Sequence, residues 1–446
     1  MTVDDLIRSY DAALGIDSGA SCFTVGDFGS MLSATLPVAE LASGAVASFA
    51  AAVDRYRVAH GLPTSAWHLD PGRITASFSG DRMLRIDDAP VQGFAELSGF
   101  FRSADGWVRT HANYPHHRRA LLAALGLPDD ADRGVAASRI GELTGQDIED
   151  RCAAASAVAV RVRTETEWAR DAASVADSGP LIRTAAGSRS SGRRRSGVRS
   201  DATADAPMRG IRVLDMTRVI AGPVSTRALA LLGADVLRVD PPQMPEIEWQ
   251  HLENGQGKRS AFLDIRASDD AEVLRDLVAT ADVVVTGYRP GALEAFGLDV
   301  LPAGVVHGRV SAWGHGPWAD RRGFDSIVQA ATGISLVEGT SEKPGALPAQ
   351  ALDHASGYLL AAAVVDALTA QRSGNDALDV SVSLARTGAW LRGRRGRVTH
   401  PVASTLPGDE TTVQHGSIRA ARPALIEYCD YPSPARRFGF DEPAFR

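Results

Sequence analysis

One carboxylate stands out for its chemical potential, because Asp353 lies at a predicted loop-to-helix junction just ahead of Gly357 and a run of small residues. An aspartate at a helix start can cap the helix, since its side chain accepts hydrogen bonds from free amides and lies at the favourable end of the helix dipole. The position also suits chemistry on a ligand, because a nearby glycine lets a ligand or a backbone approach closely. The pattern by itself favours the cap and leaves the chemical role open.

A second group of residues could bind phosphate. Arg289 lies between two glycines, directly after a predicted buried strand, where turns and ligand sites coincide in α/β folds. Its guanidinium group could grip a phosphate, although a tight turn alone would explain the glycines. Scattered surface cations are the commoner explanation for each of the other basic residues that could join it, which are Arg218, Arg238, Lys258 and Arg259.

Several other kinds of site find no support in the sequence. No glycine-rich dinucleotide fingerprint follows the first predicted strand of the α/β region, and no Walker motif occurs. His111, His116 and His117 have no carboxylate or cysteine at ligand spacing, so we expect no metal site. The 3 cysteines lie far apart, without the pattern of a disulfide framework.

The composition of the 446-residue chain, with 44% hydrophobic and 23% charged residues, is that of a soluble globular protein. A net charge of -7 offers no global attraction for nucleic acid. No stretch approaches the roughly 20 apolar residues that a membrane span needs, and the acidic start of the chain does not resemble a secretory signal. We therefore expect a cytoplasmic protein with no nucleic-acid partner and no membrane contact.

The elements that must position these residues follow an α/β pattern in the second part of the chain. Short β-rich apolar runs alternate there with amphipathic segments, which is typical of a doubly wound, mostly parallel sheet of the Rossmann-like kind. The first part is more helical and predicts a smaller α+β domain. The predicted strands are 107–111, 157–162, 211–216, 234–240, 282–286 and 305–311, and the predicted helices are 42–58, 116–125, 225–232 and 269–281.

A basic run rich in serine, arginine and glycine, residues 188–200, divides the chain. It lacks apolar periodicity and is typical of a solvated tether. The sequence therefore predicts a flexible linker over 178–207, between a first half at 1–177 and a second half at 208–446.

Six blocks of the second half occur in the order found in a known family. They are residues 210–223, 232–240, 258–260, 288–291, 311–317 and 323–325. In this order they resemble the class III CoA-transferases, which include formyl-CoA and carnitine CoA-transferases and the related 2-methylacyl-CoA racemases. The resemblance is strong over 208–372 and weak elsewhere.

The resemblance implies an activity and a set of site residues. Asp353 aligns with the family's nucleophilic aspartate, which would attack an acyl-CoA thioester and form an aspartyl-CoA intermediate that a carboxylic acid resolves. Amides at the start of its helix would stabilise the oxyanion. Coenzyme A is then a substrate, no metal is implied, and the family's interlocked dimers imply a homodimer. The positions carried over as CoA-binding are Val219, Ile220, Ala221, Lys258, Tyr288, Arg289 and Trp313.

The order of the two halves departs from the family pattern. The first half looks like the small-domain portion of the family placed first. Residues 36–44 and 347–357 also share Leu-Pro, a carboxylate and Ala-Ser-Gly ahead of an alanine-rich helix. We interpret the chain as permuted, or as a fused duplicate in which Glu40 occupies the position of Asp353, although short alanine-rich matches also arise by chance.

Two alternative functions remain open. A 2-methylacyl-CoA racemase needs a histidine partnered with an acid to move the α-proton in both directions. Phe324 stands where the racemases carry that histidine, although His354 and His315 could substitute for it. A catalytically silent CoA-binding protein would result if the permutation had destroyed the site. The donor and acceptor acids cannot be read from the sequence, because specificity rests on pocket shape.

Overall fold

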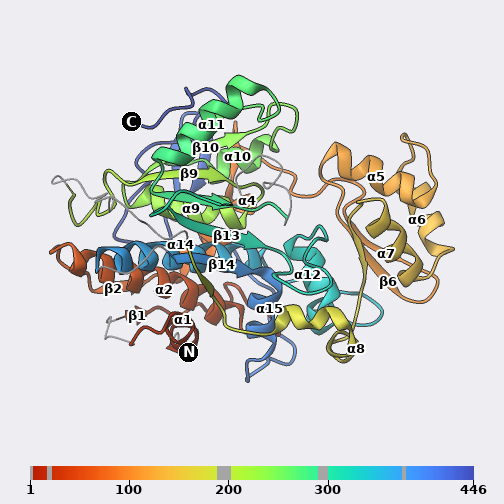
Figure 1. Ribbon diagram of the computed structural model, residues 1–446. Helices are drawn as coiled ribbons and strands as arrows, with labels where there is room; N and C mark the ends of the chain where they lie inside the picture. The colour runs from red at the N-terminus through yellow and green to blue at the C-terminus, as the bar shows by residue number, and fades with distance from the viewer. Residues whose placement is uncertain (1–3, 18–22, 188–201, 290–299, 374–377) are drawn as a thin grey trace.

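The computed structural model describes residues 4–17, 23–187, 202–289, 300–373 and 378–446. Its centre is a seven-stranded sheet in the order β11, β10, β9, β12, β13, β14, β8 (Figure 1). The first six of these strands are parallel, whereas β8 pairs antiparallel with β14. This sheet confirms the predicted fold class. The strands are β8 (Arg183–Ala186), β9 (Arg212–Met216), β10 (Asp235–Asp240), β11 (Arg259–Phe262), β12 (Val283–Thr286), β13 (Val306–Ser311) and β14 (Leu378–Ser383).

Helices cover both faces of this sheet over its central strands. Helices α9 (Ala221–Leu231) and α14 (Ala351–Arg372) pack on one face, and α11 (Ser268–Thr280) packs on the other. Strand β12 lies between the two layers, and all of its residues are buried. An unbroken valine run suits this position, because a central parallel strand is apolar on both of its faces.

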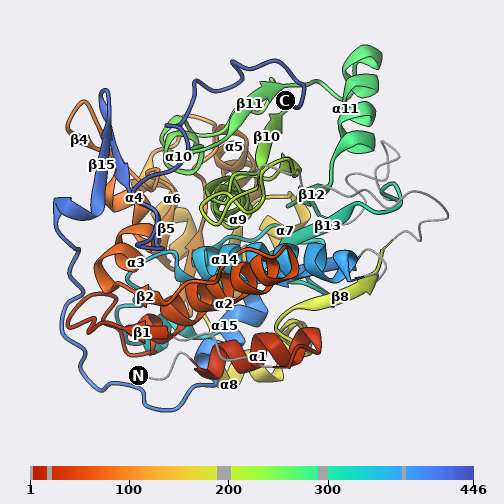
Figure 2. The same ribbon diagram turned by 90° about the vertical axis from the view of Figure 1, so that its left-hand side faces the viewer.

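Helix α14 is enclosed on every side. Its residues 351–368 are all buried, and α2 (Val38–Ala59) lies along it on the side away from the sheet (Figures 1 and 2). In the described part of the chain, α14 is the one helix long and apolar enough to cross a membrane, although the sequence suggested no stretch of that kind, and the rest of the protein buries its residues 351–368. An apolar helix of this kind is stable in water only when other elements cover it.

Helices α2 and α14 belong to a repeated unit. Both have 22 residues, and each lies between two strands that pair in parallel. In both units a short helix follows the second strand directly. The structure therefore supports the internal repeat suggested by the sequence. The first unit is β1 (Phe23–Val25), α2, β2 (Trp67–Leu69) and α3 (Pro71–Phe78), and the second is β13, α14, β14 and α15 (Leu384–Arg392). The second unit also contains two short helices, Asp325–Ala331 and Ile334–Val337, between β13 and α14.

The glycine shared by the two helices allows close packing. Gly44 and Gly357 are each the seventh residue of their helix. A Cβ atom on Gly44 would lie 2.7 Å from the Cβ of Leu6, in the helix that crosses α2. A Cβ atom on Gly357 would lie 2.7 Å from the carbonyl oxygen of Ala221 and 2.8 Å from the Cβ of Val224, both in α9. Gly357 therefore brings the backbones of α9 and α14 together.

The smaller α+β domain predicted for the first half is present. It contains an antiparallel three-stranded sheet, β5-β6-β7, with three helices beside it (Figure 1). Helix α12 (Asp325–Ala331) of the second half contacts this sheet. The elements of the lobe are β5 (Gly99–Arg102), β6 (Trp107–Thr110), β7 (Ala159–Arg161), α5 (Pro115–Leu125), α6 (Arg133–Gly141) and α7 (Gly145–Ala154).

The two halves are interwoven more closely than the predicted boundaries imply. Strand β8 falls inside the predicted linker 178–207, yet it forms an edge of the main sheet, while residues 188–201 lie outside the described residues. Near the other end of the chain, β15 (Thr412–His415) and β16 (Ile418–Ala421) join β3 (Arg85–Ile86) and β4 (Ala89–Pro90) in one four-stranded sheet. The remaining elements are α1 (Asp4–Leu14), α4 (Gly80–Met83), α8 (Glu165–Arg170), α10 (Glu248–Asn254), α13 (Ile334–Val337) and the 3-10 helices Ala172–Asp177 and Asp409–Thr411.

The close approach of α9 to α14 generates a stability prediction. Gly357→Ala should lower the free energy of unfolding by about 1–3 kcal/mol, because the new methyl group would overlap the Ala221 carbonyl. Gly388→Ala, inside α15, is the matched control, since its methyl group would meet only flexible side chains, the nearest being Leu352 at 3.4 Å. Urea unfolding of both variants measures the difference. Equal stability of the two would contradict the packing role of Gly357.

Candidate active site

Asp353 is the third residue of α14, and its side chain is almost completely buried, with 6% of the residue's surface exposed. The start of the helix is held by a different carboxylate. Asp325, the first residue of α12, accepts hydrogen bonds from the backbone N–H groups of Leu352 at 2.8 Å and Asp353 at 3.0 Å. Within the described residues, no group donates a hydrogen bond to the Asp353 side chain. Asp325 therefore caps α14, and the Asp353 carboxylate has no capping role.

The same hydrogen bonds bear on the expected oxyanion site. The resemblance implied that amides at the start of α14 would stabilise an oxyanion. Those of Leu352 and Asp353 instead point to the Asp325 carboxylate. The structure therefore assigns these two amides to helix capping.

Two buried carboxyl groups lie close together at the start of α14. Burial raises the pKa of Asp353 well above its usual range, and the nearby Asp325 carboxyl raises it further. Burial also raises the pKa of Asp325 to about 6, although its hydrogen bonds from the amides of Leu352 and Asp353 oppose this shift. Two adjacent carboxyl groups with little solvent resist simultaneous ionisation. Such perturbed acids in a cavity are typical of functional sites.

Asp353 opens into a narrow hollow of about 30 Å³, which we call the inner hollow. Its walls come from both halves of the chain. Asp325 and Gln350 lie beside Asp353, and the turn before α9 contributes Val219 and Ile220. The first half contributes a further wall through Asp81, Gly93, Phe94, His111 and Asn113.

A wider hollow of about 270 Å³, the middle hollow, adjoins the inner one. The two share Val219 and Phe324 in their walls. Val219 has a φ of 70°, which is strained for a β-branched residue, and such strain clusters at functional sites. The middle hollow is rich in basic and aromatic side chains, which are Tyr114, His116, His117, Arg218, Tyr288, Arg289, Arg321 and Arg322.

The structure thus brings four of the seven predicted CoA-binding residues to the two hollows beside Asp353, namely Val219, Ile220, Tyr288 and Arg289. Lys258 lies outside both hollows. This residue is 2% exposed, and its ammonium group donates hydrogen bonds to Asp215 at 2.9 Å and to the Pro223 carbonyl at 2.7 Å. Burial lowers the pKa of Lys258 to about 8, against the opposing effect of Asp215. Lys258 therefore holds β9 to α9, and this geometry gives no support to a binding role.

The other two predicted binding residues also lie outside these hollows. Ala221 is buried at the start of α9, where its carbonyl meets Gly357. Trp313 is buried in a cluster with Trp168 and Trp318, at 6.1 Å and 4.8 Å between ring centroids.

The histidines proposed for a racemase do not reach the surroundings of Asp353. His354 is buried against Phe78 at 5.3 Å between ring centroids, and burial lowers its pKa to about 3. His315 contacts Arg183 at 3.0 Å, and neither histidine lines the inner or the middle hollow. These positions give no geometric support to a racemase that uses His354 or His315.

A histidine that the sequence analysis set aside lies at the site instead. His111 follows β6, lines the inner hollow with Asp353, and stacks on Phe324 at 3.6 Å between ring centroids. Burial lowers the pKa of His111 well below its usual range, so the ring is neutral at physiological pH. Sequence spacing could not find this pair, because the two residues are far apart in the chain. In the described part of the chain, no cluster of histidine, cysteine and acidic residues could hold a metal ion.

Part of this chain is similar to known proteins. Residues 208–417 match the model of CoA-transferase family III. The chain is 35% identical over 192 residues to acetyl-coenzyme A transferase nodX of Hypoxylon pulicicidum, a match that covers 40% of this chain and 32% of that protein. It is 36% identical over 194 residues to the probable fatty acyl-CoA transferase Rv3272 of Mycobacterium tuberculosis, covering 39% and 49%. Human succinyl-CoA:glutarate CoA-transferase is 27% identical over 235 residues, covering 48% and 52%.

Among solved structures, the crystal structure of Rv3272 from Mycobacterium tuberculosis superposes with a TM-score of 0.39 and 34% identity. That superposition covers 41% of this chain and 56% of the other. The chain spans about a third to a half of the length of the curated relatives described above. The family match includes Asp353, Asp325 and the turn before α9. Residues 208–417, a little under half of the chain, are therefore similar to CoA-transferase family III.

Proposed function

We propose that this protein is a CoA-transferase, which moves coenzyme A from an acyl-CoA to a carboxylic acid through a covalent intermediate on Asp353. One observation carries the proposal. The Asp353 carboxylate faces the inner hollow without a hydrogen bond from any described residue, because Asp325 takes over the capping of α14. Burying a carboxylate that accepts no hydrogen bond lowers the free energy of unfolding. Buried groups of this kind are typical of functional sites.

The proposed reaction needs no external reagent. A carboxylate oxygen of Asp353 attacks the thioester carbonyl, the carbon–sulfur bond breaks, and an aspartyl mixed anhydride and a CoA thiolate result. The thiolate then attacks the aspartyl carbonyl, which releases the donor as a carboxylate and leaves an aspartyl-CoA thioester. An acceptor carboxylate attacks this thioester to form a second anhydride and free thiolate. Attack of the thiolate on the acceptor carbonyl yields the new acyl-CoA and restores the Asp353 carboxylate.

The surroundings of Asp353 suit this sequence of steps. Anhydrides and thioesters are sensitive to water, and the narrow inner hollow restricts its entry. Burial also weakens the hydration of the carboxylate, which favours attack once the substrate is bound. Val219, Tyr288 and Arg289 are proposed to hold CoA in the middle hollow, where three further arginines supply positive charge. These arginines are Arg218, Arg321 and Arg322.

The homodimer implied by the resemblance stays a prediction. In this chain the first half already supplies part of the wall around Asp353, including His111 and Asn113. One chain therefore contains both sides of the inner hollow. We propose that each chain carries one nucleophile and one CoA site, whatever its oligomeric state.

The covalent intermediate can be trapped. The protein would be incubated with acetyl-CoA, succinyl-CoA and formyl-CoA, treated with hydroxylamine and mapped by mass spectrometry. We expect a hydroxamate on Asp353, because hydroxylamine cleaves the aspartyl thioester and anhydride. Asp353→Asn should lose this adduct and lower the transfer rate by at least about 10³-fold, since the nucleophile is removed.

Glu40→Gln is the matched control for that experiment. Glu40 has the same place in α2 that Asp353 has in α14, but it lies 3.5 Å from Arg394 and lines neither the inner nor the middle hollow. Glu40→Gln should therefore leave both the hydroxamate on Asp353 and the transfer rate unchanged. Binding of CoA without any adduct, or full transfer activity in Asp353→Asn, would overturn the proposed mechanism.

The raised pKa of Asp353 leads to a prediction about pH. The transfer rate should fall as the pH is lowered through that raised pKa, because only the ionised carboxylate attacks. A carboxyl group whose pKa is raised by folding stabilises the protein at low pH, and this stabilisation is lost as the pH rises through the folded-state pKa. Asp353→Asn should therefore raise the melting temperature more at pH 8 than at pH 5, because the native state holds the Asp353 proton at a pH where the unfolded chain releases it, and the replacement removes this loss of stability.

Differential scanning calorimetry at both pH values measures this effect. The free energy of unfolding gained at pH 8 should exceed that gained at pH 5. An equal change at both pH values would contradict the raised pKa of Asp353.

A further inference from the structure

One arginine of the small lobe, which is formed by β5 to β7 and α5 to α7, is buried without an oxygen partner. Arg109 lies on β6 and is 9% exposed. Its guanidinium group donates no hydrogen bond to any described residue and forms no ion pair with one. The group lies instead against two aromatic rings, 5.0 Å from the ring centroid of Phe94 and 4.9 Å from that of Phe100. The hydrogen-bond donors of Arg109 are therefore available to a ligand.

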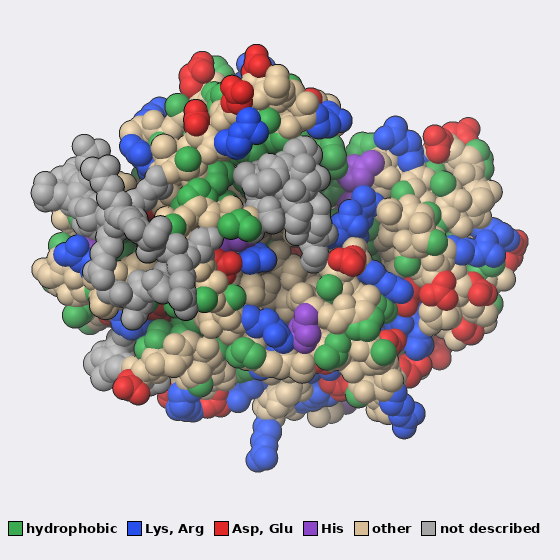
Figure 3. Space-filling model, viewed as in Figure 1, with side chains coloured by type: hydrophobic (Ala, Val, Ile, Leu, Met, Phe, Trp, Pro, Cys, Tyr) green, Lys and Arg blue, Asp and Glu red, His purple; other side chains and the backbone are tan. Residues whose placement is uncertain are grey.

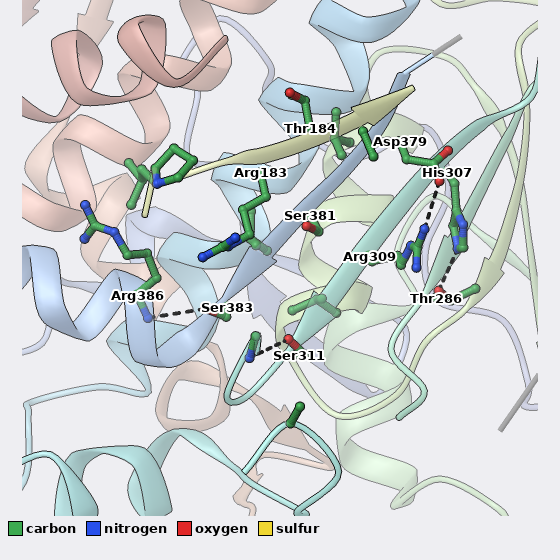
Figure 4. Close-up of a pocket in the computed structure, with 18 of the residues that line it drawn as sticks. Arg183, Thr184, Thr286, His307, Arg309, Ser311, Asp379, Ser381, Ser383 and Arg386 are labelled. Atoms are coloured by element: carbon green, nitrogen blue, oxygen red, sulfur yellow. Dashed lines mark hydrogen bonds and ion pairs between the residues drawn. The ribbon is translucent and has the colours of Figure 1, made fainter. Parts of the chain in front are cut away.

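Other arginines of the described chain have such partners. In a hollow of about 440 Å³ over β12, β13, β14 and β8, Arg309 forms an ion pair with Asp379 at 2.8 Å (Figure 4). The buried Arg163, which follows β7, binds Glu149 through hydrogen bonds of 2.7 Å and 2.8 Å. Burial lowers the pKa of Arg109 to about 10, so this guanidinium group is still charged at neutral pH. Contact with aromatic rings offsets only part of the cost of burying that charge.

Arg109 lies directly behind the wall of the inner hollow. Phe94 contributes to this wall and Arg109 does not, so the guanidinium group lies behind the Phe94 ring. His111 lines the same hollow with Asp353, and its backbone N–H group donates to the Val158 carbonyl oxygen at 3.0 Å, which continues the ladder between β6 and β7. Side chains two residues apart share one face of a strand, at a spacing of roughly 7 Å. Arg109 is therefore the next side chain beyond His111 on the face that meets the hollow.

The Phe94 ring can move without a change in the backbone around it. The side chain of Asn113 donates a hydrogen bond to the Gly93 carbonyl oxygen at 3.1 Å and accepts one from the Ala95 N–H group at 3.0 Å. These bonds hold the chain on both sides of Phe94. The ring itself is half-buried and is held by packing alone. A change of its side-chain rotamer would therefore open the way from the inner hollow to Arg109.

A negatively charged substrate in the inner hollow needs a nearby cation. The described wall contains three carboxyl groups, those of Asp81, Asp325 and Asp353, and neither lysine nor arginine. Burial raises the pKa of Asp325, and the charge of Arg109 is close enough to oppose this shift. Basic side chains also lie on the surface where the small lobe meets the rest of the molecule (Figure 3). An anionic substrate would thus meet positive charge at the surface and again at Arg109.

We infer that Arg109 determines substrate specificity by binding a second carboxylate of the substrate acid while the first carboxyl group reacts at Asp353. This inference rests on the proposed function and names its substrate class, a short dicarboxylic acid carried as its CoA monothioester. The planar guanidinium group can pair with a carboxylate through two parallel hydrogen bonds. A monocarboxylic acid would place an apolar end there and leave the donors of Arg109 unpaired. Movement of the Phe94 ring admits the second carboxylate.

Two matched pairs of substrates test the inference. Succinyl-CoA and butyryl-CoA have acyl chains of equal length, as do the acceptors glutarate and valerate, and the members of each pair differ only in the terminal carboxylate. We expect the unmodified protein to have the higher kcat/KM for the dicarboxylic member of each pair. Arg109→Gln should lower kcat/KM for succinyl-CoA about ten- to a hundredfold, because a charged hydrogen bond is lost, and should leave that for butyryl-CoA unchanged. Arg109→Lys, which keeps the charge, should retain part of the preference.

Arg102→Gln is the matched control, because Arg102 belongs to the same small sheet and lies 5.4 Å from the ring centroid of Trp107, but is exposed. It should change neither rate. An equal loss for succinyl-CoA and butyryl-CoA in Arg109→Gln would show that this arginine acts only on the fold or on the charge of Asp353, and would overturn the inference. Equal kcat/KM for both members of each pair in the unmodified protein would do the same.

The hydroxamate on Asp353 distinguishes failure of this inference from failure of the proposed function. Its formation with both succinyl-CoA and butyryl-CoA at equal rates would overturn the role of Arg109 and leave the CoA-transferase standing. Transfer from no donor, together with no hydroxamate on Asp353, would overturn the proposed function and the inference with it.

Discussion

The enclosure of α14 is the constraint on which the rest of the structure depends. This helix is apolar around its whole circumference, so it must be covered by the sheet on one side and by α2 on the other. Because Asp353 is in its first turn, the same burial that stabilises the helix removes water from the carboxylate. Packing and the raised pKa of Asp353 therefore have one physical origin. The first half of the chain is structurally part of the candidate site, since it provides the cover.

The repeated unit explains how one chain can provide both partners of this packing. In the second unit the strands belong to a large sheet with hollows at its edge, and the first turn of the helix carries Asp353. In the first unit β1 pairs only with β2 among the described strands, and the equivalent Glu40 lies near Arg394. The two copies of this backbone unit therefore have different roles. One positions the proposed nucleophile, and the other supplies a surface that fits it.

Local sequence patterns predicted the central sheet well, because strands such as β9, β10, β12 and β13 are short apolar runs next to amphipathic helices. The prediction of Asp353 as the nucleophile came from the family resemblance rather than from any spacing rule. What escaped prediction depends on contacts across long stretches of chain. Examples are the antiparallel β8 at the sheet edge, the capping of α14 by Asp325, and the stacking of His111 on Phe324. Lys258 shows the opposite failure, since a cation in a matching block proved to be buried with Asp215.

The sheet that joins β15 and β16 to β3 and β4 has a consequence for biosynthesis. Strand β3 pairs early with β4, but it gains its second partner, β16, only after residues 418–421 have left the ribosome, more than three hundred residues later. Helix α2 must wait almost as long for α14. During this interval the nascent first half exposes an apolar helix and an open strand edge. Surfaces of both kinds promote misfolding and aggregation and are bound by chaperones. Contacts between segments this far apart in the chain form slowly, and the rate of translation sets how long the apolar surface of the first half stays uncovered.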